Sequence, residues 1–134
     1  MGMYTELHFN AEVKKGSEAV PILEYMVDNS VGTLPAVMPE HQLFQAWRWK
    51  FMFQCDSYYF DAKTISTFEY DKIVDNYYLC IRSNLKNYDN EIELFIDWIM
   101  PYLNKVDGEF LGFYRYEETE EPTLIYMREV VEKI

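Results

Sequence analysis

Residues 5–14, TELHFNAEVK, decide the fold class of this chain. Apolar and polar side chains alternate strictly along this segment. The apolar set is Leu7, Phe9, Ala11 and Val13, and the polar set is Glu6, His8, Asn10, Glu12 and Lys14. Because successive side chains of a β-strand point to opposite faces, the pattern predicts a strand with one buried face and one face toward water.

Two segments have the apolar spacing of amphipathic helices. The first covers residues 17–28 and follows the opening strand directly. The second covers residues 89–107, where Asp89 or Asn90 is of the residue type that caps a helix N-terminus. Pro101 lies inside its apolar pattern, so we expect a kink there, or an end to regular hydrogen bonding about one turn earlier.

The remaining segments have strand patterns, with turn residues between them. They are residues 47–55 (restarting at 58–60), 64–70, 77–86, 110–117 and 123–130. In the first of these, one predicted face carries Trp47, Trp49, Phe51, Phe53 and Cys55. The order of elements is then β-α-β-β-β-α-β-β. It predicts an α+β fold: an antiparallel sheet of five to six strands with two helices on one face, a ferredoxin-like variant, in a single domain over residues 1–134.

Composition limits the classes of function. The net charge of −11 argues against binding to a nucleic-acid backbone or to an anionic membrane, because both need a cationic surface. The sequence has no signal-peptide pattern and no apolar run that could span a membrane, so we expect a cytoplasmic protein. Cys55 and Cys80, both in strand-like segments, are then expected to be reduced and buried, although one disulfide between neighbouring strands stays open.

Aromatic residues are unusually frequent, with 12 Tyr, 9 Phe and 3 Trp. Two helices cover only one face of a sheet, and the strands carry aromatic residues on both faces. We therefore expect an exposed aromatic face that binds another protein or a second copy of the chain as a homodimer. The predicted interaction residues are Trp47, Arg48, Tyr58, Tyr70, Tyr78, Tyr114 and Tyr116.

The sequence contains no strong motif for catalysis, metal binding or a cofactor, and we expect none of these. His8 lies in a polar row that could in principle bind a metal, but an exposed structural role is favoured. Cys55 is interpreted as a small core residue rather than a nucleophile. Arg48 and Lys50 form a basic cluster that either holds an anionic ligand or, as we favour, pairs with acidic neighbours.

Three segments resemble small uncharacterised proteins of phage and prophage regions. They are Tyr4-Thr5-Glu6-Leu7, Arg48-Trp49-Lys50-Phe51 with Tyr58-Tyr59-Phe60, and the run from Asn84 to Ile92 (NLKNYDNEI). The resemblance spans nearly the whole chain and implies an accessory protein that acts by binding. It brings no known activity and no functional residues.

The leading hypothesis is a non-enzymatic acidic protein-interaction module, such as an accessory or inhibitor protein that binds a host protein. Its most acidic segment is a loop with Glu117, Glu118, Glu120 and Glu121. One variant is an inhibitor whose carboxylates imitate a nucleic-acid backbone. The alternative is a small-molecule binder or enzyme with a pocket between the 30–45 loop and the sheet, holding His41, Arg48 or Asp56.

Overall fold

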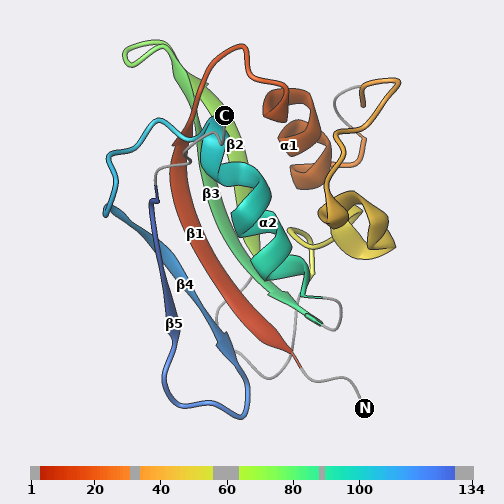
Figure 1. Cartoon of the computed structure of the whole chain (residues 1–134), viewed down its shortest axis with the longest axis vertical. Coiled ribbons are helices and arrows are strands. Elements are labelled where there is room, and N and C mark those ends of the chain that lie inside the picture. Colours follow the sequence, from red (N-terminus) through yellow and green to blue (C-terminus); the bar gives the residue numbers. More distant parts are fainter. Residues whose placement is uncertain (1–3, 31–33, 56–63, 88–89, 129–134) are drawn as a thin grey trace, which may run out of the picture.

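A computed structural model describes residues 4–30, 34–55, 64–87 and 90–128 (Figure 1). One antiparallel sheet has the strand order β2-β3-β1-β4-β5. The strands are β1 (Thr5–Val13), β2 (Ile65–Asp71), β3 (Asn76–Leu85), β4 (Phe110–Tyr116) and β5 (Thr123–Tyr126). The helices are α1 (Ala19–Val27) and α2 (Glu91–Ile99), and three short 3-10 helices are η1 (Gln42–Gln45), η2 (Trp47–Lys50) and η3 (Met100–Tyr102).

Strand β1 is the centre of the sheet, as its alternating sequence predicts. It pairs with β3 along its whole length and with β4 over its first half. Leu7, Phe9, Ala11 and Val13 are fully buried. We call the side of the sheet that carries them the core face, and the opposite side the outer face.

Both helices contribute buried residues to the one core that covers the core face. Phe95 of α2 packs edge-on against Phe9 of β1, with ring centroids 5.4 Å apart. Ile22, Leu23 and Met26 of α1 are fully buried in the same core. None of the helices in the described part of the chain is both long and apolar enough to cross a membrane.

The predicted strand over residues 47–55 is wrong, because the described residues there form η2 and a following turn. The backbone hydrogen bonds run three residues back, from Phe51 N to Arg48 O and from Gln54 N to Phe51 O. Trp49, Met52 and Phe53 are buried, which is the spacing of a helical turn. The alternating aromatic residues suggested a strand, but Phe51 and Trp47 lie outside the core. Residues 58–60 lie outside the described part of the chain.

Asn90 is the N-cap residue of α2, one of the two positions predicted, but the expected side-chain cap bond is not formed. Asn90 has a left-handed backbone (φ 58°) and its side chain makes no cap hydrogen bond, while position 89 is not described. Instead, Asn87 Oδ1 accepts from Ile92 N at 2.8 Å, and Asn87 Nδ2 donates to Glu93. Regular helix ends at Ile99 and passes into η3, which contains Pro101, as predicted.

Candidate functional site: a groove beside the β4–β5 hairpin

Two helices are too narrow to cover five strands. An α-helix is about 10 Å wide, and neighbouring strands are about 4.8 Å apart, so one helix covers about two strands. Figure 1 shows α2 in front of the central strands, with the β4–β5 hairpin standing beside it. The hairpin therefore lies beside α2, although Leu111 and Ile125 on its core face are buried in the common core.

A groove runs between α2 and the core face of the hairpin. It consists of two pockets, with volumes of about 310 and 250 Å³, that share Glu93, Tyr114 and Thr123. Toward the hairpin loop the lining adds Thr5, Asn87, Arg115, Tyr116, Thr119 and Glu121. In the other direction it adds Ile96, Met100, Leu124, Ile125, Tyr126 and Arg128.

The wall from α2 is acidic at one end and apolar at the other. Glu93, Ile96 and Met100 recur three and four residues apart, so they share one side of the helical segment. Asn87 Nδ2 donates to both carboxylate oxygens of Glu93, at 3.0 and 3.2 Å. This bond fixes the Glu93 carboxylate beside the groove at the N-terminus of α2, where the helix dipole favours a negative charge.

The floor of the groove is aromatic. Tyr114 pairs with Leu7 of β1, and Tyr116 pairs with Thr5, so both tyrosines lie on the core face. Tyr116 is 37% exposed, and Tyr114 is partly buried against the core. Burial, and next the Glu93 carboxylate, raise the pKa of Tyr114, while a side-chain hydrogen bond with Thr123 acts in the opposite direction.

The acidic loop lies at one end of the groove. Glu118, Glu120 and Glu121 are exposed, and Glu121 lines the groove itself. The loop is anchored by Arg115, which donates to Thr119 O at 3.0 Å and to Glu6 Oε1 at 2.9 Å. Two carboxylates, Glu93 and Glu121, thus lie at the polar and aromatic end of the groove.

The predicted interaction residues do not form one surface. Tyr114, Tyr116 and Glu121 meet in the groove. Trp47 and Arg48 line a different pocket. Tyr58 lies outside the described residues. The groove residues that sequence reasoning missed are Thr5, Asn87, Glu93, Ile96, Met100, Arg115, Thr119, Thr123, Leu124, Ile125, Tyr126 and Arg128.

The sequence predicted several tyrosines on an exposed aromatic face. Of those that the structure describes, only Tyr78 lies on the outer face of the sheet. Tyr78 pairs with Glu12 and is 47% exposed on the outer face. The centre of that face is polar, with Glu6, Asn10 and Arg82, and its only ring stack in the described chain joins His8 and Phe113 at 4.5 Å. Exposed apolar side chains gather instead toward β5, at Phe110, Leu124 and Tyr126.

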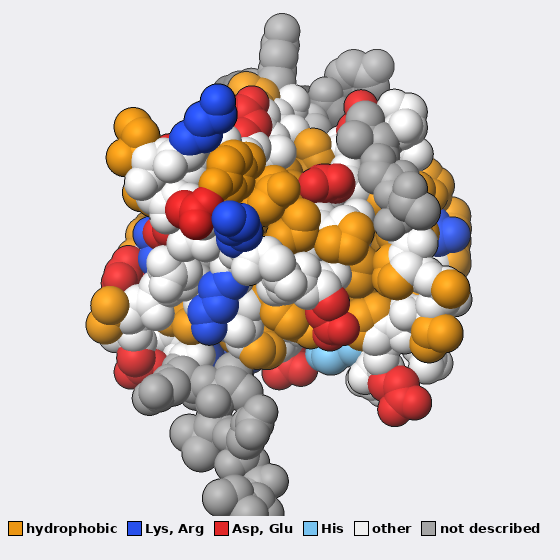
Figure 2. All heavy atoms as spheres, turned by 90° about the horizontal axis from the view of Figure 1, so that it is seen from above, with side chains coloured by type: hydrophobic (Ala, Val, Ile, Leu, Met, Phe, Trp, Pro, Cys, Tyr) orange, Lys and Arg blue, Asp and Glu red, His pale blue; other side chains and the backbone are white. Residues whose placement is uncertain are grey.

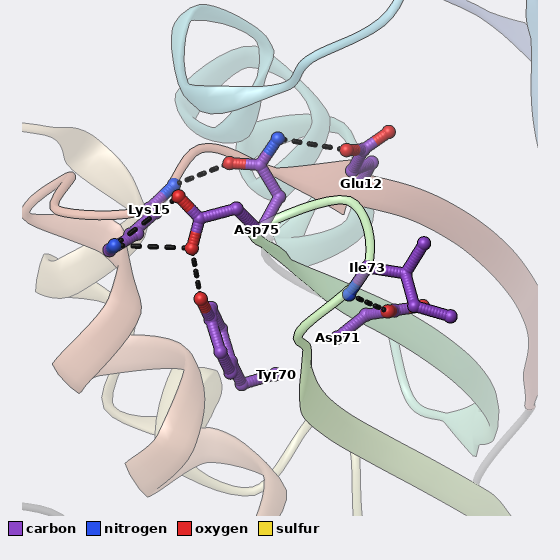
Figure 3. Close-up of polar contacts among 7 residues, drawn as sticks. Glu12, Lys15, Tyr70, Asp71, Ile73 and Asp75 are labelled. Carbon is purple, nitrogen blue, oxygen red and sulfur yellow. Dashed lines mark hydrogen bonds and ion pairs between the residues drawn. The ribbon is translucent and has the colours of Figure 1, made fainter.

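Tyr70 has a structural role at the β2–β3 turn (Figure 3). Its hydroxyl donates to Asp75, which also accepts from Lys15 Nζ at 3.1 Å. Beside it, Asn76 Nδ2 donates to Glu12 at 2.8 Å. These contacts tie the turn to the loop after β1. Figure 2 shows acidic, basic and hydrophobic side chains interspersed at this end of the molecule, without one dominant charge.

The histidines do not form a catalytic or metal site in the described structure. His41 Nε2 lies 2.9 Å from Asp97, but its Nδ1 accepts from Leu43 N, so neither ring nitrogen is available as a base. Burial lowers the pKa of His8, and the opposing effect of Glu6 is smaller. No three His, Cys, Asp or Glu side chains gather at metal-binding distance among the residues described.

The two cysteines are free and half-buried rather than fully buried. Cys80 lies in β3 on the outer face, opposite Asn10 and Thr67. Cys55 follows the turn after η2, and not a strand, and lines the pocket of Trp47 and Arg48. Burial, the largest cause, raises the pKa of the Cys55 thiol, so it is a poor nucleophile at neutral pH.

Comparison with known proteins adds no family. The chain matches no protein-family model, no curated protein and no solved structure. The groove therefore has to be interpreted from its own chemistry.

Proposed function

We propose that the chain is a non-enzymatic protein-interaction module, and that the groove beside the β4–β5 hairpin binds a basic amphipathic helix of another protein. The observation that carries the proposal is a groove between α2 and the hairpin whose one end carries two carboxylates, Glu93, which is held by Asn87, and the exposed Glu121. A groove of this kind matches the helix-in-groove mode, in which the apolar side of a helix packs into the groove.

The width and charge of the groove support this occupant. A third helix over the hairpin would extend the helical layer to the fifth strand. Its apolar side would pack on Ile96, Tyr114 and Tyr116, and Lys or Arg side chains at one end would meet Glu93 and Glu121. The net charge of −11 would attract a basic partner and repel a second copy.

The fold itself supports the presence of a groove. We infer a ferredoxin-like variant in which β1 to β4 and the two helices form the basic unit and β5 is added outside β4. Two helices suffice for four strands, so the added strand widens the sheet beyond its helical cover. The resemblance to phage and prophage proteins supports an accessory or inhibitor role against a host protein.

Imitation of a nucleic-acid backbone has less support. Arg115 is tied into the acidic loop, and Arg128 lines the neighbouring part of the groove. Cations are therefore interspersed with the carboxylates, whereas a backbone mimic needs a row of like charges.

The test uses three labelled amphipathic helical peptides with the same apolar side and a basic, neutral or acidic polar side. Fluorescence anisotropy should detect saturable binding of the basic peptide alone. Chemical-shift changes in nuclear magnetic resonance spectra should map to Glu93, Tyr114 and Tyr116. Equal affinity for all three peptides, or chemical-shift changes confined to the outer face, would contradict the proposal that the groove binds a basic helix.

A matched pair of variants separates the groove from general charge attraction. Glu121→Lys and Glu69→Lys change the net charge equally, but Glu69 is exposed on the outer face of β2, far from the groove lining. We expect Glu121→Lys to lower the affinity for the basic peptide about tenfold. Glu69→Lys should lower that affinity less than about twofold. Equal losses would mean that only the overall charge is recognised.

A further inference from the structure

A second pocket lies apart from the groove, where η2 approaches the end of β3. Its volume is about 380 Å³, and it shares no lining residue with the groove. The lining consists of Tyr4, Trp47, Arg48, Phe51, Met52, Cys55, Leu85, Lys86 and Glu91.

Backbone contacts build this pocket onto the sheet. Asn84 N of β3 donates to Cys55 O at 3.1 Å, so the turn after η2 is held beside the strand. Met52 and Leu85 are almost completely buried, whereas Trp47 is 68% and Phe51 43% exposed. The two exposed rings meet edge to face, with centroids 6.3 Å apart. The result is an apolar pocket with an aromatic rim.

Two cationic side chains line this pocket, the half-buried Arg48, whose Nη1 is enclosed by the protein, and Lys86. Arg48 Cζ is 5.8 Å from the centroid of the Trp47 ring, and Lys86 Nζ is 5.6 Å from that of Tyr4. A chain with 23 acidic and 12 basic residues repels anions over most of its surface. Two cations beside one apolar pocket therefore mark a place where an anionic group can bind.

The buried end of the pocket has different chemistry. Glu91 is fully buried in the first turn of α2, where the helix dipole favours its charge. The raised pKa of Cys55 keeps the neighbouring thiol neutral. A ligand's own carboxylate would thus avoid Glu91 and lie at the rim, near Arg48 and Lys86, with its apolar body inside.

We propose that this pocket binds a small amphiphilic carboxylate, with an apolar chain or ring against Trp47 and Phe51 and the carboxylate between Arg48 and Lys86. The inference does not rest on the groove, and either site can fail its test without the other. Ligand pockets commonly combine apolar walls with a few polar groups that orient the ligand, as this one does.

The first experiment uses the anionic fluorescent dye 8-anilino-1-naphthalenesulfonate as the probe. We expect saturable binding, displacement by octanoate and little displacement by octylamine, which has the same apolar chain with the opposite charge. Equal displacement by octylamine, or no binding of the dye, would overturn the proposal.

Neutral substitutions locate the anion. Arg48→Gln and Lys86→Gln should each weaken octanoate binding about fivefold to tenfold. Lys50→Gln is the matched control, because Lys50 lies 6.0 Å from the Trp49 ring and outside the pocket lining. If the Arg48→Gln variant folds poorly, octanoate binding to Trp47→Ala, a substitution at an exposed position, gives a second measurement of the same site. Losses as large in Lys50→Gln as in Lys86→Gln would contradict the assigned site.

The two free cysteines provide a readout that depends on position. Saturating octanoate should slow the modification of Cys55 by iodoacetamide and leave the rate at Cys80 unchanged, since Cys80 lies on the outer face. Peptide mass spectrometry measures both rates in one sample. Equal protection of both thiols, or none at Cys55, would place the ligand elsewhere.

Discussion

At the scale of single residues, His8 couples stability to pH. Its ring stacks on Phe113 at 4.5 Å, and burial lowers its pKa from the ordinary value of 6.5. The unfolded chain then binds more protons than the folded chain just below that value, so the free energy of unfolding rises with pH there. We expect the part of the stability that depends on His8 to be fully present above pH 6.5, and to be lost as the pH falls through the folded-state pKa of His8.

Two measurements check this coupling. Nuclear magnetic resonance titration should place the midpoint of His8 below 6.5. Urea unfolding of His8→Gln should show a weaker dependence of stability on mildly acidic pH than the parent chain. A midpoint at or above the ordinary value, or an unchanged dependence in the variant, would contradict the role of burial.

At the scale of elements, Gly112 allows β4 to lie between β1 and β5. The register of β4 against β5 shifts between Phe110 and Gly112, and Gly112 has φ 154° opposite Phe9. A Cβ atom there would lie 1.9 Å from His8 O, so the backbones would have to separate. We expect Gly112→Ala to lower the free energy of unfolding by about 3 kcal/mol in urea unfolding.

Gly108→Ala is the control for this prediction. Gly108 also has a positive φ, of 89°, but a Cβ atom there meets nothing within 4 Å. We expect only the cost of a left-handed backbone, about 1 kcal/mol. Similar losses in the two variants would show that backbone conformation, and not the contact between β1 and β4, sets the cost.

At the scale of the whole molecule, the homodimer stays a prediction, and the structure restricts where its interface can lie. The centre of the outer face is polar, so a dimer on that face would use the exposed Phe110, Leu124 and Tyr126 near β5, the last two of which also line the groove. Because each copy carries a charge of −11, repulsion should weaken a dimer at low salt, and screening by salt should strengthen it. Sedimentation velocity should show a larger fraction of dimer as the salt concentration rises. In Leu124→Glu this rise in the dimer fraction should be absent. A monomer at every salt concentration, at high micromolar protein, would exclude the homodimer.

The sequence by itself determined the central strand, the two helices and the two hairpins. In β1 the strict alternation leaves one register that buries Leu7 and Phe9, because a slip by one residue would bury Glu6 and His8 instead. In α2 the apolar spacing around Phe95 similarly selects one side of the helix. These features are local, since each follows from neighbours a few residues apart.

Tertiary structure alone decided the segment after residue 45 and both candidate sites. The side chains of 47–55 satisfy a strand pattern, but burial of Trp49, Met52 and Phe53 against the core selects helical turns. Glu93 and Tyr114 meet in the groove only because the strand order brings β4 beside α2, across a long stretch of chain. Local periodicity carries no information about which distant segments become neighbours, because that choice depends on how the helices share the area of the sheet.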